Sequence, residues 1–390
     1  MTSASLRVAV IGGGIIGVSS AVHLARLGAR VTLLTEHGVA NEASGRSLAW
    51  LNSARFRSSE YHRLRMIGID RYRTLAARHP DAKWLRFDGG LTWDADDASN
   101  KIADAFAHET RVGYDALHIS ADQIDAVTPG LDARVVTPQG AIFNPGEGWV
   151  DLPSLISILL DEFRSRGGQI ALDAGDVSVD VNGGRVKGVV TAHNDRVDCD
   201  AVLVATGAAI PKFAAQVGHV IPDATPIALL ARSKPFDHQL KAVLNTPNVA
   251  MRPTPDGAIV FDSAWSEQQT SRAKDGGFRI EPSTLERLVA EASKVLAGNP
   301  KIELAGYGIG FKPVPKDGEP VLGALDGIPG YFVAFTHSGA TVGLISGELL
   351  AREIIVGELS PLLKNFRPGR FAQTRSPNRP DDARSKEAVG

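Results

Sequence analysis

Residues 6–36 constrain the fold most strongly, because they carry three glycines at the spacing of a phosphate-binding turn. Gly12, Gly14 and Gly17 match the pattern G-x-G-x-x-G, with Ile15 and Ile16 at its two variable positions. The apolar segment 6–11 is typical of a buried parallel strand, residues 18–25 have helical apolar spacing, and 31–35 indicate a second strand. The chain therefore predicts a Rossmann βαβ unit that binds a dinucleotide.

Each glycine has a physical role in such a unit. Gly12 permits the tight turn, Gly14 lets the backbone approach a pyrophosphate, and Gly17 lets the helix pack closely on the strand. The helix N-terminus offers free N–H groups to the phosphates. Glu36, about 20 residues past the loop, is the candidate for the ribose hydroxyls. Thr35 is the residue at the end of the strand itself. Alternatively, Thr35 and the backbone bind the ribose in place of Glu36. The alternative for the whole motif is a glycine-rich turn without a ligand.

Composition excludes several classes of function. The 390 residues are enough for two or three domain-sized cores, and a formal net charge of -2 argues against a nucleic-acid partner. The single cysteine, Cys199, cannot form an intramolecular disulfide, which is consistent with a reducing compartment. We find no secretory signal, no apolar run long enough to cross a bilayer and no metal-ligand spacing. We expect a soluble cytoplasmic protein with no transmembrane segment.

The remaining chain alternates helical and strand-like segments. Residues 60–77 predict an amphipathic helix with arginines on one side and apolar residues toward a core. Further helices are expected at 102–112, 153–166 and 282–297. A last helix is expected to follow the turn at 337–339 and to end at about residue 356. Strands are expected near 90–93, 169–172, 177–181, 186–191, 200–205 and 331–336. The polar segment 372–390 predicts a disordered tail.

Several blocks beyond the glycine loop resemble the D-amino-acid-oxidase-type flavoprotein family, which contains glycine oxidase, sarcosine oxidase and D-amino-acid dehydrogenases. Residues 43–47 resemble the loop along the FAD pyrophosphate and ribityl chain. Residues 148–153 resemble the block that returns the chain to the FAD domain, and 205–207 resemble its A-T-G strand end. Residues 310–323 and 337–341 resemble the C-terminal flavin blocks. The blocks follow the family order across residues 8–371.

This resemblance implies an α/β fold, in which a Rossmann-type FAD-binding domain is interleaved with a sheet-rich α+β substrate domain. The FAD-binding domain would comprise 1–80, 150–217 and 312–371, and the substrate domain 81–149 and 218–311. Non-covalent FAD is expected, because Gly310 and Ala49 occupy the positions at which some relatives attach flavin. The oligomeric state stays open, a homo-oligomer included.

The resemblance also implies which residues contact FAD. Val177 would contact adenine through its backbone, and the helix that begins near Ala340 would point its N-terminus at the pyrimidine edge of the flavin, where negative charge develops on reduction. The full set is Gly12, Gly14, Ile15, Ile16, Gly17, Thr35, Glu36, Ser44, Gly45, Arg46, Ser47, Val177, Thr206, Gly207, Gly339, Ala340 and Thr341.

One position departs from the family pattern. Members that act on amino acids often carry an arginine before the proline of a G-x-R-P block, and this chain has Lys312 there. Lysine is a point charge without the guanidinium fork that grips a carboxylate at two points. Arg252, or Arg55 and Arg57, could replace it as the anchor, and each could equally be a solvated surface charge. His337 either contacts flavin or substrate, or holds its turn by a hydrogen bond.

We therefore predict an FAD-dependent enzyme that removes hydride from a carbon bearing an amine, giving an imine that water hydrolyses. Lys312, Arg252 and His337 are the candidate catalytic residues, the substrate is a small amine or amino acid, and oxygen or an electron carrier takes the electrons. The alternatives are a flavin-dependent 2-hydroxy-acid dehydrogenase, a non-catalytic FAD-binding subunit and an NAD-dependent dehydrogenase.

Overall fold

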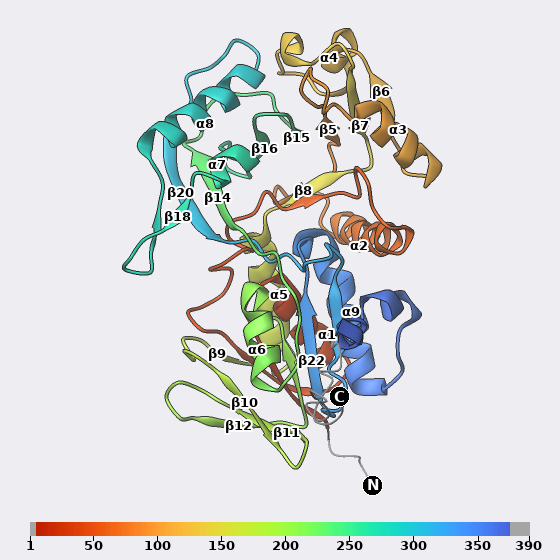
Figure 1. The fold of residues 1–390 in the computed structure, drawn as a ribbon, viewed down its shortest axis with the longest axis vertical. Helices are drawn as coiled ribbons and strands as arrows, with labels where there is room; N and C mark the ends of the chain where they lie inside the picture. The colour runs from red at the N-terminus through yellow and green to blue at the C-terminus, as the bar shows by residue number, and fades with distance from the viewer. Residues whose placement is uncertain (1–4, 375–390) are drawn as a thin grey trace, which may run out of the picture.

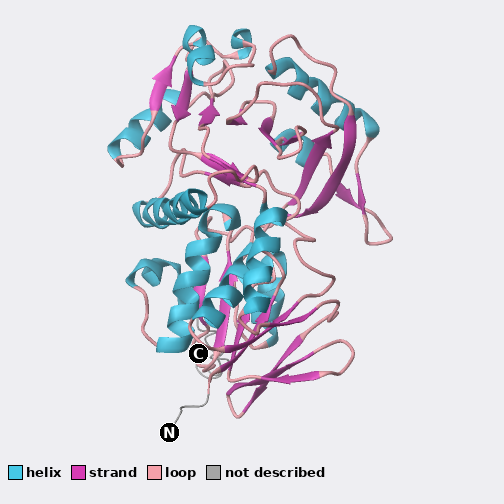
Figure 2. Cartoon of the chain, turned by 180° about the vertical axis from the view of Figure 1, so that it is seen from behind, coloured by secondary structure: helices cyan, strands magenta, loops and turns pink. Residues whose placement is uncertain are grey.

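The computed structural model describes residues 5–374 and consists of two lobes joined by a small sheet. The lobe at the bottom of Figure 1 holds a six-stranded sheet between layers, and the upper lobe holds an eight-stranded sheet with helices on its outer side. Figure 2 shows the same separation from behind. The predicted fold class, α/β with a Rossmann-type unit and a sheet-rich second part, is confirmed.

The six-stranded sheet has the order β21-β22-β13-β1-β2-β9, and only the edge strand β21 runs antiparallel to its neighbour. Ile11 at the end of β1 lies between Leu34 and Val204, so the carboxyl ends of three strands meet at one edge. The strands are β1 (Arg7–Ile11), β2 (Arg30–Leu34), β9 (Gln169–Ala171), β13 (Ala201–Val204), β21 (Val321–Ala324) and β22 (Tyr331–Phe335).

Alternating side chains give this sheet two buried faces. Val8 and Val10 point to the layer of α1 (Ile15–Arg26), α5 (Leu152–Ser165) and α9 (Gly339–Val356). Ala9 and Ile11 point to the opposite layer. That layer contains α6 (Ile210–Gln216) and the antiparallel sheet of β10 (Ser178–Asn182), β11 (Arg185–Val190) and β12 (Arg196–Asp198).

The eight-stranded sheet has the order β20-β14-β17-β16-β15-β5-β7-β6. One face carries Leu229, Met251 and Phe261 into a core that Leu288 of α8 closes. The strands are β5 (Gly90–Thr92), β6 (Leu117–Ile119), β7 (Ala141–Asn144), β14 (Ile227–Ser233), β15 (Val243–Asn245), β16 (Ala250–Pro253), β17 (Ile259–Asp262) and β20 (Leu304–Phe311). The helices of this lobe are α3 (Ile102–Arg111), α4 (Ile124–Val127), α7 (Ala264–Glu267) and α8 (Pro282–Val295).

The junction between the lobes contains the sheet β3 (Trp50–Leu51), β8 (Gly148–Val150) and β4 (Leu85–Arg86), with α2 (Ser59–Arg78) beside it. The small hairpin of β18 (Ser271–Arg272) and β19 (Phe278–Arg279) extends from the upper lobe. Residues 372–374 were predicted as tail but belong to a 3-10 helix, Pro368–Thr374. Arg370 anchors this helix by bonding to Asp317 (2.9 Å). The rest of the predicted tail lies outside the described residues.

A buried hydrogen-bond network holds the junction. Glu147, in the turn before β8, is fully buried and accepts hydrogen bonds from the Tyr114 hydroxyl and from Trp50 Nε1 (2.7 Å). The Tyr114 hydroxyl in turn accepts from Ser53 N (2.9 Å). Burial and, less strongly, the nearby Glu109 carboxylate raise the pKa of Glu147 to about 8. At neutral pH the Glu147 carboxyl is therefore mostly protonated.

This raised pKa predicts a pH-dependent stability that Glu147→Gln removes. The folded wild type binds a proton that the unfolded chain releases between about pH 4.5 and pH 8, so wild-type stability falls as pH rises through that window. The limiting slope for one proton is about 1.4 kcal/mol per pH unit. Urea unfolding of both proteins at pH 5, 7 and 9 should show the difference growing with pH. The exposed substitution Glu286→Gln is the control, and a pH-independent difference for Glu147→Gln would contradict the account.

Candidate functional site

The glycine loop connects β1 to α1 in backbone contact with the end of β13. A Cβ added to Gly12, whose φ is 122°, would lie 2.4 Å from the carbonyl oxygen of Ala205. A Cβ on Gly17 would lie 2.0 Å from the carbonyl oxygen of Gly12. No larger side chain fits at either position, so the loop, the start of α1 and residues 205–207 meet at the carboxyl edge of the sheet.

The polar groups at this edge fit the pyrophosphate of FAD. The buried Thr206 Oγ1 has no hydrogen-bond partner among residues 5–374, and a buried orphan of this kind indicates a missing ligand. The N-cap residue of α1 is Gly14, which has no side chain to cap the helix. Ser44 Oγ accepts from Ile15 N (3.0 Å), which brings the loop 44–47 to the same place. A helix N-terminus with neighbouring hydroxyls is an anion-binding arrangement.

The predicted ribose and adenine contacts lie together beyond the end of β2. Glu36 is exposed, and its backbone carbonyl accepts from Gly175 N (3.3 Å), two residues before the buried Val177. Thr35 is buried, and its hydroxyl accepts from Gly38 N (3.1 Å) within the turn. Because the Thr35 side chain is engaged in the turn, we propose Glu36 for the ribose contact.

The N-terminus of α9 lies against the N-terminus of α1. Carbons of Ile15 and Ile16 lie 3.8 Å from where a Cβ of Gly339 would stand. Thr341 Oγ1 donates to the carbonyl of Trp50 (3.0 Å), and the carbonyl of Ala340 accepts from the Tyr72 hydroxyl (2.6 Å). Two helix N-termini therefore converge near the junction between the lobes.

A cavity of about 420 Å³ lies between the loop 44–47 and the face of the eight-stranded sheet that turns toward the lower lobe. Ser44, Gly45, Arg46 and Ser47 line it on one side, and Arg252 lies on the other. Arg46 Nη1 donates to the carbonyl of Ile309 (3.1 Å) and so joins the loop to β20.

Arg252 is held by two backbone carbonyls and an aromatic ring, and the Asp151 carboxylate lies 3.9 Å from its Nη2. It donates to the carbonyls of Leu48 and Pro253 and lies over the Trp149 ring, 5.0 Å from its centroid. Burial lowers its pKa to about 10. No hydrogen bond or ion pair within the described part of the chain joins Arg252 to Lys312 or His337. We therefore favour a role in tying β16 to the residues before β3.

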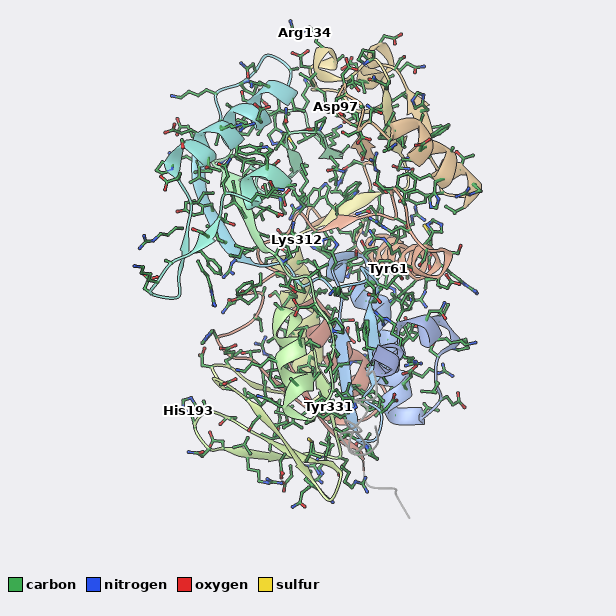
Figure 3. The ribbon with its side chains drawn as sticks, viewed as in Figure 1. Tyr61, Asp97, Arg134, His193, Lys312 and Tyr331 are labelled. Carbon is green, nitrogen blue, oxygen red and sulfur yellow. The ribbon has the colours of Figure 1, made fainter. Side chains whose placement is uncertain are left out.

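Lys312 lies directly after β20, between the two lobes (Figure 3). Its Nζ donates to Glu267 of α7, and the positive charge of Lys312 also acts on Asp262 at the end of β17. Two carboxyl groups thus compete with any substrate carboxylate for this ammonium. Burial raises the pKa of Asp262 to about 7, and no hydrogen bond reaches the Asp262 carboxyl from residues 5–374.

His337 forms the centre of a group of positive side chains. Desolvation by the surrounding protein and, less strongly, the charges of Lys312, Arg65 and Arg57 lower its pKa to about 4. We call these four side chains the cationic cluster. Although protein atoms crowd the ring, His337 keeps part of its surface exposed to solvent, and no hydrogen bond to its ring occurs among the described residues. Thr336 Oγ1 instead holds the turn by accepting from Ser338 N (3.3 Å).

Arg57 is the member of the cationic cluster with a buried, unused donor. Its Nε is buried and has no partner among the described residues, whereas its Nη1 donates to the carbonyl of Phe56 (2.9 Å). Burial and the neighbouring Arg65 lower its pKa to about 10. Arg55, the other candidate in this segment, also has a buried Nη1 without a partner among the described residues, but its Nη2 pairs with Asp94 (2.9 Å), so its charge is already balanced. The fork of Arg57 is therefore open to an anionic ligand.

Sequence reasoning missed Arg65, Asp262 and Glu267. The helix 60–77 was expected to turn its arginines away from the core, but Arg65 is only 2% exposed. Its neighbours Asn52 and Ser338 come from other segments, so the helical pattern carried no signal for it. Asp262 and Glu267 join the site only because β17 and α7 end beside Lys312.

Residues 5–374 contain no helix that is both long and apolar enough to cross a membrane. Within the same range, no three His, Cys, Asp or Glu side chains are grouped so that they could hold a metal ion.

Comparisons with known proteins identify the family of this chain. The profile of the family described as FAD dependent oxidoreductase (DAO) matches residues 7–353. The chain is 27% identical to the glycine oxidase of Pseudomonas aeruginosa over 366 residues, covering 89% of this chain and 94% of that protein. Its fold is similar to that of glycine oxidase from Geobacillus kaustophilus, with a TM-score of 0.79 at 20% identity, covering 94% of this chain and 99% of the other.

The iminodiacetate oxidase of Chelativorans sp. BNC1 is also similar in structure, with a TM-score of 0.77 at 23% identity, covering 93% of this chain and 99% of the other. The family match spans the glycine loop, both lobes and most of α9. The chain belongs to the DAO family of FAD-dependent oxidoreductases.

Proposed function

We propose that the protein oxidises the C–N bond of an amino acid or of a secondary amine that carries a carboxylate. The observation that carries this proposal is a cation and a carboxyl that each keep unused hydrogen-bonding capacity. Arg57 has an unpartnered buried Nε, and Asp262 has a carboxyl without a hydrogen bond among the described residues. The charge of Lys312 acts on both Asp262 and His337, and the charge of Arg57 acts on His337, which supports a proposed substrate cleft that uses both groups.

These charges match a zwitterion. Arg57 would bind the substrate carboxylate through its guanidinium, in the role that the resemblance first suggested for Lys312. Lys312 is neutralised by Glu267 and is less suited to that role. Asp262 would hold the substrate ammonium and accept its proton, because an amine must be neutral before hydride leaves the adjacent carbon. A hydroxy acid would use the Arg57 side of the cleft but not the Asp262 side.

FAD, bound non-covalently, would accept the hydride, and water would hydrolyse the resulting imine. The chain's own residues would bind, orient and deprotonate the substrate. His337, whose pKa is lowered to about 4, would be neutral at physiological pH and would face the substrate without adding a charge. Oxygen or an electron carrier would reoxidise the cofactor.

A substrate panel tests the proposed reaction. Glycine, sarcosine, iminodiacetate, D- and L-amino acids and 2-hydroxy acids are each mixed with the yellow holoenzyme without oxygen. Bleaching of the flavin by one or more amino acids, and not by their hydroxy analogues, is expected. Bleaching by hydroxy acids alone would overturn the proposal, and bleaching by dithionite alone would favour a non-catalytic subunit. Repeating the active case in air separates an oxidase from a dehydrogenase.

Replacement of Arg57 tests the carboxylate contact. A hydrogen bond to a charged partner contributes about 1.5–3 kcal/mol, so Arg57→Met should raise KM roughly 10- to 100-fold. The expected loss is confined to carboxylate substrates, and the corresponding amine without a carboxylate should be oxidised at its wild-type rate. Arg63→Met, an exposed change six residues further along the chain in α2, is the control. An equal loss for both substrates would show that Arg57 acts otherwise.

The raised pKa of Asp262 predicts how kcat/KM depends on pH. Its pKa of about 7 means that it accepts a proton above that pH and is already protonated below it, so kcat/KM should rise with pH through about 7. Asp262→Asn should lower kcat/KM by about 10²-fold or more and remove this limb, leaving only the ionisation of the substrate amine. The exposed Asp237→Asn should retain the wild-type profile. A limb near pH 7 that persists in Asp262→Asn would rule Asp262 out as the proton acceptor.

A further inference from the structure

The segment 53–57, which carries Arg57, is held by side chains from one short stretch of the upper lobe. It lies between β3 and α2, and three of its alternate backbone N–H groups point at side chains of residues 108–114. Ser53 N donates to the Tyr114 hydroxyl (2.9 Å), Arg55 N to Glu109 Oε1 (2.6 Å) and Arg57 N to His108 Nε2 (3.5 Å). The path of this segment therefore depends on α3 and on the turn that follows it.

The shortest of these three bonds is made by a buried carboxyl group. Glu109 of α3 is 1% exposed, and its second oxygen accepts from Asn144 Nδ2 (2.8 Å). A buried carboxyl group is costly unless its oxygens are hydrogen-bonded, and both oxygens of Glu109 are. Loss of this side chain would leave Arg55 N without its acceptor, which indicates a specific role for Glu109 in holding the segment.

Arg55 has a backbone conformation that the chain does not favour by itself. Its φ is 67°, in the left-handed region that residues with a side chain rarely adopt. Such a conformation persists only where the surrounding structure holds it. The bond from Arg55 N to Glu109 and the ion pair of its guanidinium with Asp94 (2.9 Å) hold it here. The bend at Arg55 is thus imposed by the upper lobe.

This bend determines where the Arg57 side chain lies. The only hydrogen bond of its guanidinium within residues 5–374 goes to the carbonyl of Phe56 (2.9 Å), inside the same segment, and its Nε is buried and unpartnered. No contact with another segment fixes the guanidinium in the described part of the chain, so its position follows the backbone two residues after Arg55.

We propose that Glu109 is the positioning residue for Arg57: from the upper lobe it holds segment 53–57 in its left-handed bend and thereby sets how tightly the site binds a carboxylate. The proposal rests on the proposed function only in assigning the substrate carboxylate to Arg57. It does not depend on whether the bond that is oxidised is C–N or C–O. Helix α3 would thus control carboxylate binding without contacting the substrate.

Acetate, a carboxylate without an amine, tests this role on the FAD-loaded full chain. Its dissociation constant is measured by calorimetric titration, which needs no turnover. Glu109→Met removes both acceptor oxygens and should weaken acetate binding about tenfold. Glu109→Gln keeps an acceptor for Arg55 N, and its new N–H can bond to the unpartnered Asn144 Oδ1 if that amide turns over, so binding should stay within about threefold of wild type. Asp104→Asn, exposed on the same helix, is the control.

Two replacements at Arg55 separate the bend from the side chain, and they decide the matter if Glu109→Met does not fold. Arg55→Gly and Arg55→Val both remove the pair with Asp94 and keep the N–H that Glu109 accepts. Glycine adopts a φ of 67° readily, and valine does not. Arg55→Gly should bind acetate within about threefold of wild type, and Arg55→Val about tenfold more weakly. Equal weakening by both would show that the guanidinium matters and the bend does not, against the proposal.

With a carboxylate substrate, Glu109→Met should raise KM about tenfold and leave kcat within about twofold, a split that partial unfolding would not produce. Normal acetate binding by folded Glu109→Met would refute the role of Glu109. Arg57→Met is titrated alongside. If it weakens acetate binding and Glu109→Met does not, only the positioning role fails. If Arg57→Met also binds acetate normally, the carboxylate contact of the proposed function fails, and the role of Glu109 fails with it.

Discussion

The close backbone contact between the glycine loop and the end of β13 is the constraint on which the rest of the site depends. Gly12 lies against the carbonyl of Ala205, and Gly17 lies against the carbonyl of Gly12. These contacts hold the N-terminus of α1 at the carboxyl edge of the six-stranded sheet. Thr206 Oγ1 lies buried at this edge without a partner among the described residues, so it is free to bond to a group bound there.

Packing contacts connect the N-terminus of α1 to the junction between the two lobes. Gly343 lets α9 approach Ile15 closely, so the N-termini of α1 and α9 converge. Thr341 joins α9 to the chain at Trp50, and Trp50 joins the buried Glu147. Each link is a short contact between segments distant in sequence. The position of the cationic cluster relative to the carboxyl edge of the sheet therefore depends on the whole packed core.

The cationic cluster contains charges in different physical settings. The charges of Arg57, Arg65 and Lys312 all lower the pKa of His337. Lys312 is balanced by Glu267, and Arg65 is held by neutral groups alone. Low solvent access strengthens each of these interactions. Similar residue types are thereby given different tasks: Lys312 is internally paired, Arg57 is open to a ligand, and Arg65 supports the start of α9.

The sequence alone determined the βαβ unit, the main helices and the family, because glycine spacing and apolar periodicity are local properties of the chain. It also showed that Lys312 departs from the family pattern, because this position lies inside a block that resembles the family's G-x-R-P block. Tertiary structure decided which charges are usable. Glu267 neutralises Lys312, the carbonyl of Leu48 holds Arg252, and Asn52 and Ser338 bury Arg65. Each of these partners lies more than ten residues away in sequence. Burial and charge pairing depend on which segments meet, so only the packed lobes reveal them.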